Sequence, residues 1–260
     1  MGDSQEEILQ ELQRALGILE RVRESNPEIG NKAIDIYAAC FYVPDKRLEG
    51  YIEKLKLFLQ LKNPSPKEKR DSGYLLEQIV LLSFCSLKGF TSVKSFQSPG
   101  PQYDLIISGD NPDWEAICKY LYIDFSKRGI IIESKAINQP VKDQQFALLC
   151  SVMELNLCNT VGLGVFFTLN GATGFPKENE SRQRKISDAR LRQLLFYAKT
   201  QKPIVILDKN DIFKLKDKGS LLKILALKIR DLSEFSGLYI SPCEEPIEVD
   251  LPEHLNQFLY

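Results

Sequence analysis

Apolar residues recur at spacings of three and four along the first quarter of the chain, which predicts amphipathic helices. The first runs from Gln5 to about Arg23, and its apolar stripe consists of Ile8, Leu9, Leu12, Leu16, Leu19 and Val22. Asn26-Pro27 ends this helix, and further helices are predicted over 29–42 and 48–61. The stripe needs a covering surface, which is either the rest of the chain or another copy.

A proline-rich and charged stretch separates these helices from the remainder. Residues 62–73 read KNPSPKEKRDSG, a pattern typical of a linker. We therefore predict a helical N-terminal region (1–62), a linker (63–72), a larger unit (73–240) and an irregular C-terminal tail (241–260) with three Pro and five acidic residues.

In the larger unit, helical and strand patterns alternate. After an apolar helix over 73–87, strands are predicted at 92–96, 102–108, 129–135, 162–169 and 203–207, and helices at 114–122, 141–157, 187–200 and 221–232. Residues 109–128 form a polar excursion between two strands. This order predicts an α/β fold with a mixed sheet.

Composition narrows the chemistry. The 260 residues include 34 basic and 35 acidic side chains and one His, His254. A single imidazole argues against a multi-His zinc site and against Ser-His-Asp or Cys-His catalysis. A net charge of −1 argues against nonspecific coating of nucleic acid, and confines any such contact to a local basic patch.

The rest of the composition indicates a soluble, cytoplasmic protein that does not enter a membrane. The six Cys are widely spaced and mostly lie in apolar runs, which favours buried, reduced thiols. The first ten residues, MGDSQEEILQ, lack the basic and then apolar pattern of a secretory signal.

The candidate chemistry centres on the strand GIIIESK. Glu133 and Lys135 are two residues apart, so their side chains point to one face, while Ile132 and Ser134 point to the other. Asp104 at the start of an earlier strand and Glu77 on the apolar helix are candidate neighbours. Convergence of the four would give three carboxylates and one amine. Carboxylates of this kind suit Mg²⁺ with substrate phosphate, and a nearby Lys can orient or help activate a water, which together predict phosphodiester hydrolysis.

The order of these residues resembles the PD-(D/E)xK nuclease superfamily, in its restriction endonuclease-like branch. The resemblance covers about 72–207 and implies a three-layer core with a mixed central sheet flanked by helices. It also implies that Asp104 and Glu133 bind Mg²⁺, which Mn²⁺ can replace, that Lys135 acts on the water and that Glu77 completes the site. A supporting Gln is expected on the next helix, at Gln145 in preference to Gln144. Tyr103 stands where the motif has Pro, and the 29 residues from Asp104 to Glu133 exceed the usual hairpin, so 109–128 is interpreted as an insertion.

The function implied by this resemblance is a Mg²⁺-dependent DNA endonuclease of restriction or defence. The basic loop with Arg182, Arg184 and Lys185 is a candidate for phosphate contact. Cleavage of both strands of a duplex favours a homodimer. Two alternatives stay open: an inactive nuclease fold that serves as a binding or assembly module, and a nuclease acting on RNA or branched DNA. The alternative, non-catalytic interpretation of Glu133 and Lys135 is a surface ion pair on an edge strand.

Overall fold

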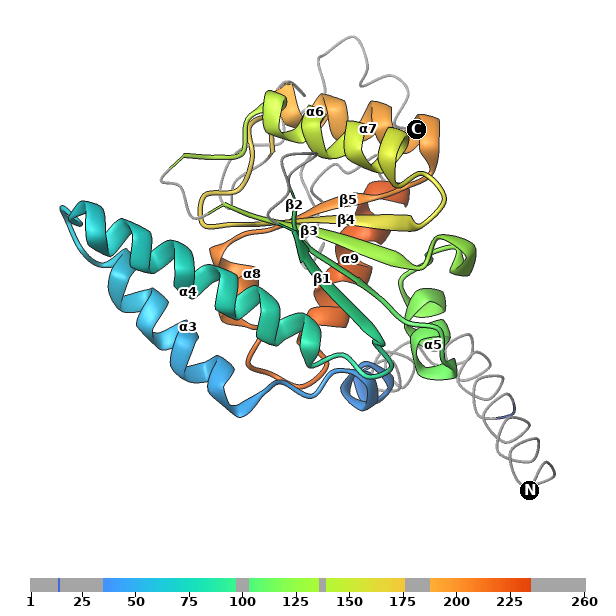
Figure 1. Cartoon of the computed structure of the whole chain (residues 1–260), viewed down its shortest axis with the longest axis horizontal. Helices are drawn as coiled ribbons and strands as arrows, with labels where there is room; N and C mark the ends of the chain where they lie inside the picture. The colour runs from blue at the N-terminus through green and yellow to red at the C-terminus, as the bar shows by residue number, and fades with distance from the viewer. Residues whose placement is uncertain (1–13, 15–34, 97–102, 136–138, 176–187, 235–260) are drawn as a thin grey trace, which may run out of the picture.

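Five strands form one mixed sheet in the order β1-β2-β3-β4-β5 (Figure 1). The computed structural model describes residues 14, 35–96, 103–135, 139–175 and 188–234. The β1–β2 and β2–β3 pairs are antiparallel, and the β3–β4 and β4–β5 pairs are parallel. The bounds are β1 Ser92–Phe96, β2 Tyr103–Ser108, β3 Gly129–Lys135, β4 Val161–Thr168 and β5 Ile204–Leu207. The predicted α/β class and all five strands are confirmed.

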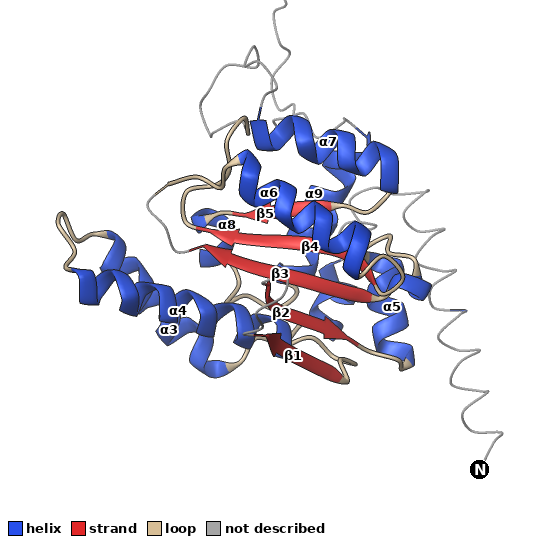
Figure 2. Cartoon of the chain, turned by 45° about the horizontal axis from the view of Figure 1, so that its top comes forward, coloured by secondary structure: helices blue, strands red, loops and turns tan. Residues whose placement is uncertain are grey.

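Helices cover both faces of this sheet (Figure 2). They are α3 Lys46–Leu59, α4 Pro66–Cys85, α5 Pro112–Tyr120, α6 Asp143–Ser151, α7 Asp188–Thr200, α8 Lys209–Phe213 and α9 Ser220–Glu234. Residues 35–41 are also helical, and short 3-10 and π segments occupy Phe125–Lys127 and Val152–Asn156. The predicted helix over 141–157 is therefore α6 followed by a π turn. The predicted helix over 5–23, apart from Arg14, and the tail over 241–260 lie outside the described residues.

The central strands are buried on both sides, which explains their continuous apolar runs. Side chains of one parity, such as Ile130 and Ile132, join a core with α3, α4, α5 and α9. Side chains of the other parity, such as Ile131 and Phe166, join a second core with α6 and α7. Strand β3 thus separates two cores. A polar side chain on it is surrounded by apolar residues and needs a hydrogen-bond or ion-pair partner.

The linker predicted over 63–72 is wrong, because most of it forms the first two turns of α4. Ser65 caps this helix: its hydroxyl accepts from the Glu68 backbone N–H, and the Glu68 carboxylate accepts from the Ser65 N–H. Pro66 occupies the first helical position, where its missing N–H costs no hydrogen bond. The charged residues 67–71 that follow Pro66 lie on the solvent-facing side of the first turns of α4.

The N-terminal helices share the core of the larger unit. Ala38, Tyr42, Leu48, Ile52 and Leu55 are fully buried with residues of α4 and the sheet. The Tyr42 hydroxyl donates to the Leu215 carbonyl at 2.6 Å. For the described residues, the predicted boundary near residue 62 therefore does not separate two cores.

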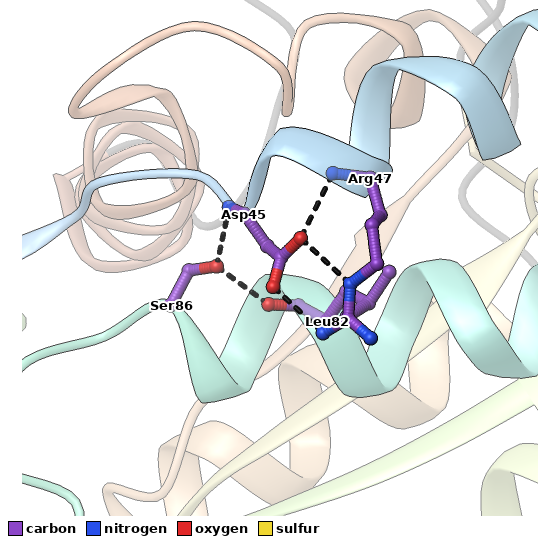
Figure 3. A network of polar contacts seen from close by, with 4 residues as sticks. All are labelled: Asp45, Arg47, Leu82 and Ser86. Carbon is purple, nitrogen blue, oxygen red and sulfur yellow. Dashed lines mark hydrogen bonds and ion pairs between the residues drawn. The ribbon is translucent and has the colours of Figure 1, made fainter.

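A polar network also joins the start of α3 to the end of α4 (Figure 3). The Asp45 carboxylate accepts from the Arg47 backbone N–H at 2.8 Å and binds its guanidinium through both oxygens. The Asp45 N–H donates to Ser86 Oγ, which donates to the Leu82 carbonyl at 2.7 Å. These bonds satisfy backbone groups at both helix ends.

The helix predicted over 114–122 within the polar excursion is confirmed as α5, but the excursion is not polar throughout, because one face of this helix joins the core. Asn111 caps α5, and Trp114 is fully buried with its indole N–H donating to the Arg128 carbonyl at 3.0 Å. Ile117 and Leu121 are buried in the same core. Charged positions on the outer face of α5 conceal this apolar face in the sequence.

Two other sequence expectations are tested in part. Five of the six Cys are described, and all five are free thiols, but Cys40 and Cys158 are exposed, so burial is wrong for these two. Among the helices in the described part of the chain, none combines the length and apolarity that crossing a membrane requires.

Candidate active site at the ends of β2 and β3

Strands β2 and β3 stop pairing where their polar residues begin. Leu105 and Ile132 form the last pair of the ladder on this side, and Asp104 and Glu133 are the next residue on each strand. In a continued antiparallel ladder these two positions would face each other on the same side of the sheet. On the other side, β4 continues beside β3 and pairs Glu133 with Phe166 and Lys135 with Thr168. The end of β3 is therefore open toward β2 and closed toward β4.

Asp104 binds the backbone of β3 through its side chain. Its Oδ2 accepts from the Ser134 backbone N–H at 2.5 Å and from the Ser134 hydroxyl at 2.6 Å. The carboxylate thus takes the place of a main-chain partner where the ladder ends. Among hydrogen bonds between described residues, both that reach this carboxylate use Oδ2.

Glu133 and Lys135 form an ion pair on one face of β3, as their spacing predicts. The contact joins Glu133 Oε1 and Lys135 Nζ, and the side chains are 11% and 28% exposed. Glu133 shares its face with Ile131 and Phe166 of the second core. Because β3 is central and the carboxylate is buried, the interpretation as a surface pair on an edge strand does not hold.

The pKa of the Glu133 carboxyl is raised above its usual value. Burial is the main cause, and the negative charge of Asp104 adds to it. Hydrogen bonding and charge from Lys135, and a backbone hydrogen bond from Asp104, act in the opposite direction. Glu133 therefore lies near both the Lys135 ammonium and the Asp104 carboxylate. Carboxylates with pKa values shifted in this way are common at catalytic sites.

Glu77 approaches this site from α4 without joining a hydrogen-bond network that the described residues show. Its side chain is exposed, and its pKa is raised first by partial burial of the carboxyl and then by the charge of Asp104. Helix α4 packs over β2 and β3 on the face of the first core. Glu77 is thus an electrostatic neighbour of Asp104, on the side of the sheet away from Glu133.

Gln145 lies in the first turn of α6, as expected, but its side chain is used locally. Its Oε1 accepts from the Lys142 backbone N–H at 3.0 Å, which satisfies the N-cap of the helix. The start of α6 is held near the sheet by two backbone bonds, from Val141 N to the Gly171 carbonyl and from Thr173 N to the Val141 carbonyl, both 2.9 Å. Gln145 therefore orders the segment that follows β3, and Gln144 is exposed.

The described residues contain no group of three or more His, Cys, Asp or Glu arranged to hold one metal ion. Glu77, Asp104 and Glu133 are therefore not brought together as a three-carboxylate set. Asp104 and Glu133 remain as two carboxylates at adjacent strand ends, beside the Lys135 ammonium. Two carboxylates with waters and substrate phosphate suit Mg²⁺, so the donor chemistry fits this cation without Glu77 as a direct ligand.

Sequence reasoning missed Ser134. Strand alternation assigns its side chain to the face opposite Glu133, yet its hydroxyl reaches the Asp104 carboxylate. A hydroxyl between two charged residues at the end of an all-Ile strand was the available signal. Arg182, Arg184 and Lys185, the candidate phosphate contacts, lie outside the described residues.

Comparison of the chain with protein-family models, with curated proteins and with solved structures gives no match.

Proposed function

We propose that this protein is a Mg²⁺-dependent endonuclease that hydrolyses DNA phosphodiester bonds, with a restriction endonuclease-like core. The observation that carries the proposal is the separation of β2 and β3 immediately beyond Leu105 and Ile132, where Asp104, Glu133 and Lys135 gather. The mixed sheet with helices on both faces is consistent with the layered core that the sequence resemblance implies.

In this proposal Asp104 and Glu133 would hold Mg²⁺ at the open end of β3. The chemistry that the cation supplies when bound is polarisation of the phosphodiester and a lower pKa for bound water. Burial raises the pKa of Glu133, whereas a bound cation would lower it by favouring the charged form. Metal affinity should therefore increase as pH rises.

Lys135 supplies positive charge on the same face as Glu133. An ammonium there can orient the attacking water and stabilise negative charge that develops on phosphate oxygens. Its neighbour across the parallel ladder, Thr168, is fully buried, so the base of the Lys135 side chain stands on a well-ordered part of the sheet. A group held in this way is suited to act at a fixed position.

The remaining predicted residues take supporting parts. Glu77 adds negative charge near Asp104, and Gln145 fixes the start of α6. Arg182, Arg184 and Lys185 are proposed to contact DNA phosphates, because the net charge of −1 leaves this work to a local basic loop. A homodimer would supply the two active sites that duplex cleavage needs, and restriction or defence is the proposed setting.

The test is incubation of the full chain with supercoiled and linear DNA in Mg²⁺ or Mn²⁺, with and without EDTA. Lys135→Met and Asp104→Asn are expected to lower the cleavage rate by a factor of 100 or more. The matched control is Lys228→Met. Lys228 pairs with Asp211 at 2.9 Å, and their side chains are 31% and 15% exposed, close to the 28% and 11% of Lys135 and Glu133. Cleavage that is equal in Lys135→Met and Lys228→Met would overturn the catalytic assignment.

A second candidate is a nuclease fold kept as a binding or assembly module. It is favoured by the internal satisfaction of the site, because Asp104 Oδ2 is bound by Ser134 and Glu133 Oε1 by Lys135. This candidate predicts no cleavage and no uptake of Mn²⁺ in calorimetry, with retained binding of a partner. A panel of labelled duplex DNA, branched DNA and RNA separates the third candidate, a nuclease with another substrate.

A further inference from the structure

We infer that Ser134 is a positioning residue for Asp104, an inference that rests on the proposed metal-dependent activity. The evidence is the paired contact of one residue with one oxygen. Ser134 N donates to Asp104 Oδ2 at 2.5 Å, and Ser134 Oγ donates to the same atom at 2.6 Å. Hydrogen bonds to a carboxylate are among the stronger hydrogen bonds in proteins.

These two bonds fix the Asp104 carboxylate where the main chain no longer does so. The β2–β3 ladder ends with the pair Leu105–Ile132 and does not include Asp104, the adjacent residue of β2. Without the bonds from Ser134, the Asp104 side chain would be free to rotate about its own torsions. Because both bonds from Ser134 reach Oδ2, they leave Oδ1 for a cation.

The side chain of Ser134 starts on the face of β3 opposite to Glu133 and Lys135, and its hydroxyl still reaches the Asp104 carboxylate. This is the face of α4, so the Asp104 carboxylate is held between the two faces of the sheet, within reach of charge from both Glu77 and Glu133. Glu-Ser-Lys in β3 therefore contributes three consecutive polar groups: a carboxylate, a hydroxyl for Asp104 and an ammonium.

Loss of the hydroxyl should loosen the carboxylate without removing it. In Ser134→Ala the backbone N–H still donates to Asp104, and one of the two bonds is lost. Partners that orient a metal ligand typically change metal affinity by about 10- to 100-fold. We therefore expect Mn²⁺ binding to the full chain, measured by calorimetry without DNA, to weaken about 10-fold. Ser134→Thr keeps a hydroxyl and should restore most of the affinity.

Cleavage kinetics supply a second measurement. Because Ser134 acts through Asp104 and not on DNA, Ser134→Ala should lower kcat at a fixed Mn²⁺ concentration and leave KM for DNA within about twofold. Raising the Mn²⁺ concentration should recover part of the lost rate, which a general folding defect would not allow. The matched control is Ser108→Ala. It removes the 2.8 Å hydroxyl contact between Ser92 and Ser108 at the other end of β2 and should leave both measurements unchanged.

The outcomes separate this inference from the function on which it rests. If the wild type neither binds Mn²⁺ nor cleaves DNA, the proposed function fails and Ser134 loses its role with it. If the wild type does both and Ser134→Ala matches it, the positioning role alone is overturned. If Ser134→Ala and Ser134→Thr are equally impaired, the loss does not follow the hydroxyl, and the positioning role is overturned.

Discussion

Buried Glu133 and partly buried Lys135 form an ion pair from alternate positions of one central strand, and Asp104 lies at the end of the neighbouring strand. A charged pair in this place costs desolvation free energy that two apolar residues would not. This desolvation cost falls at the end of the β2–β3 ladder, where backbone groups need partners other than the opposite strand. This relationship leads to the predictions below.

Replacement of Glu133 by Gln should change how stability depends on pH. The folded-state pKa of Glu133 is raised, so the folded chain binds a proton more tightly than the unfolded chain. The free energy of unfolding therefore falls as pH rises from the unfolded pKa through the folded pKa, and stays lower above it. Glu133→Gln should remove this contribution. The variant should gain stability relative to the wild type as pH rises above the unfolded-state pKa of a glutamate, in urea titrations at several pH values. A constant difference across these pH values would contradict the prediction.

Replacement of the Lys135 ammonium by an uncharged side chain should destabilise the fold. In Lys135→Met the Glu133 carboxylate stays buried and loses its ion-pair partner, which should cost about 1–3 kcal/mol. In Lys228→Met the Asp211 carboxylate also loses its ion-pair partner but keeps the bond from the Asp208 N–H, so the cost should be similar or smaller. Urea unfolding at neutral pH measures both. Similar stability losses, with cleavage lost only in Lys135→Met, would place the difference in chemistry and not in folding.

The cap of α4 should be worth a measurable amount. Ser65→Ala removes the hydroxyl that accepts from Glu68 N at 3.3 Å and should lower stability by about 1 kcal/mol. Ser65→Asp keeps an acceptor and should retain most of it. Thermal unfolding followed by circular dichroism measures both variants. If alanine and aspartate are equally tolerated, residues 65–68 do not start a helix.

Trp114 should report on the packing of the segment between β2 and β3. It is the single Trp of the chain and is fully buried. Its fluorescence should be blue-shifted in the folded protein and shift to the red on unfolding. Trp114→Ala should cost about 3–5 kcal/mol, because the cavity adds to the lost burial. Trp114→Phe should cost less, since it keeps most of the apolar surface and loses the bond to the Arg128 carbonyl. A red-shifted native spectrum would indicate an exposed, inserted segment.

Metal binding should stabilise the folded chain. A ligand that binds only the folded state at 100 times its Kd adds about 2.7 kcal/mol. Saturating Mn²⁺ should therefore raise Tm in the wild type, EDTA should reverse the rise, and Asp104→Asn should abolish it. A rise of equal size in Asp104→Asn would assign the binding to another site.

The sequence by itself determined the class of fold and most of its elements. Alternating helical and strand patterns are local properties of the chain, so all five strands and the apolar helix now seen as α4 were predictable. The spacing of Glu133 and Lys135 likewise fixed their common face, because side chains alternate along any strand.

The sequence predictions were less accurate where proline or charged residues are compatible with both a loop and a helix. Pro64 and Pro66 indicated a linker, but Ser65 and Pro66 start α4. Charged residues over 109–128 indicated a polar excursion; the helix over 114–122 was predicted, but the burial of its Trp114 and Ile117 face in the main core depends on the tertiary structure. In both cases the apolar partner is far away along the chain, so no short window of sequence contains it.

Only the tertiary structure decided which polar residues meet. The end of the β2–β3 ladder sets Asp104 on Ser134 and near Glu133, and the packing of α4 leaves Glu77 outside a common ligand set. These relationships depend on where two strands stop pairing and on which face a helix covers. Such choices come from the balance of packing over the whole chain, and the residue types alone do not contain them.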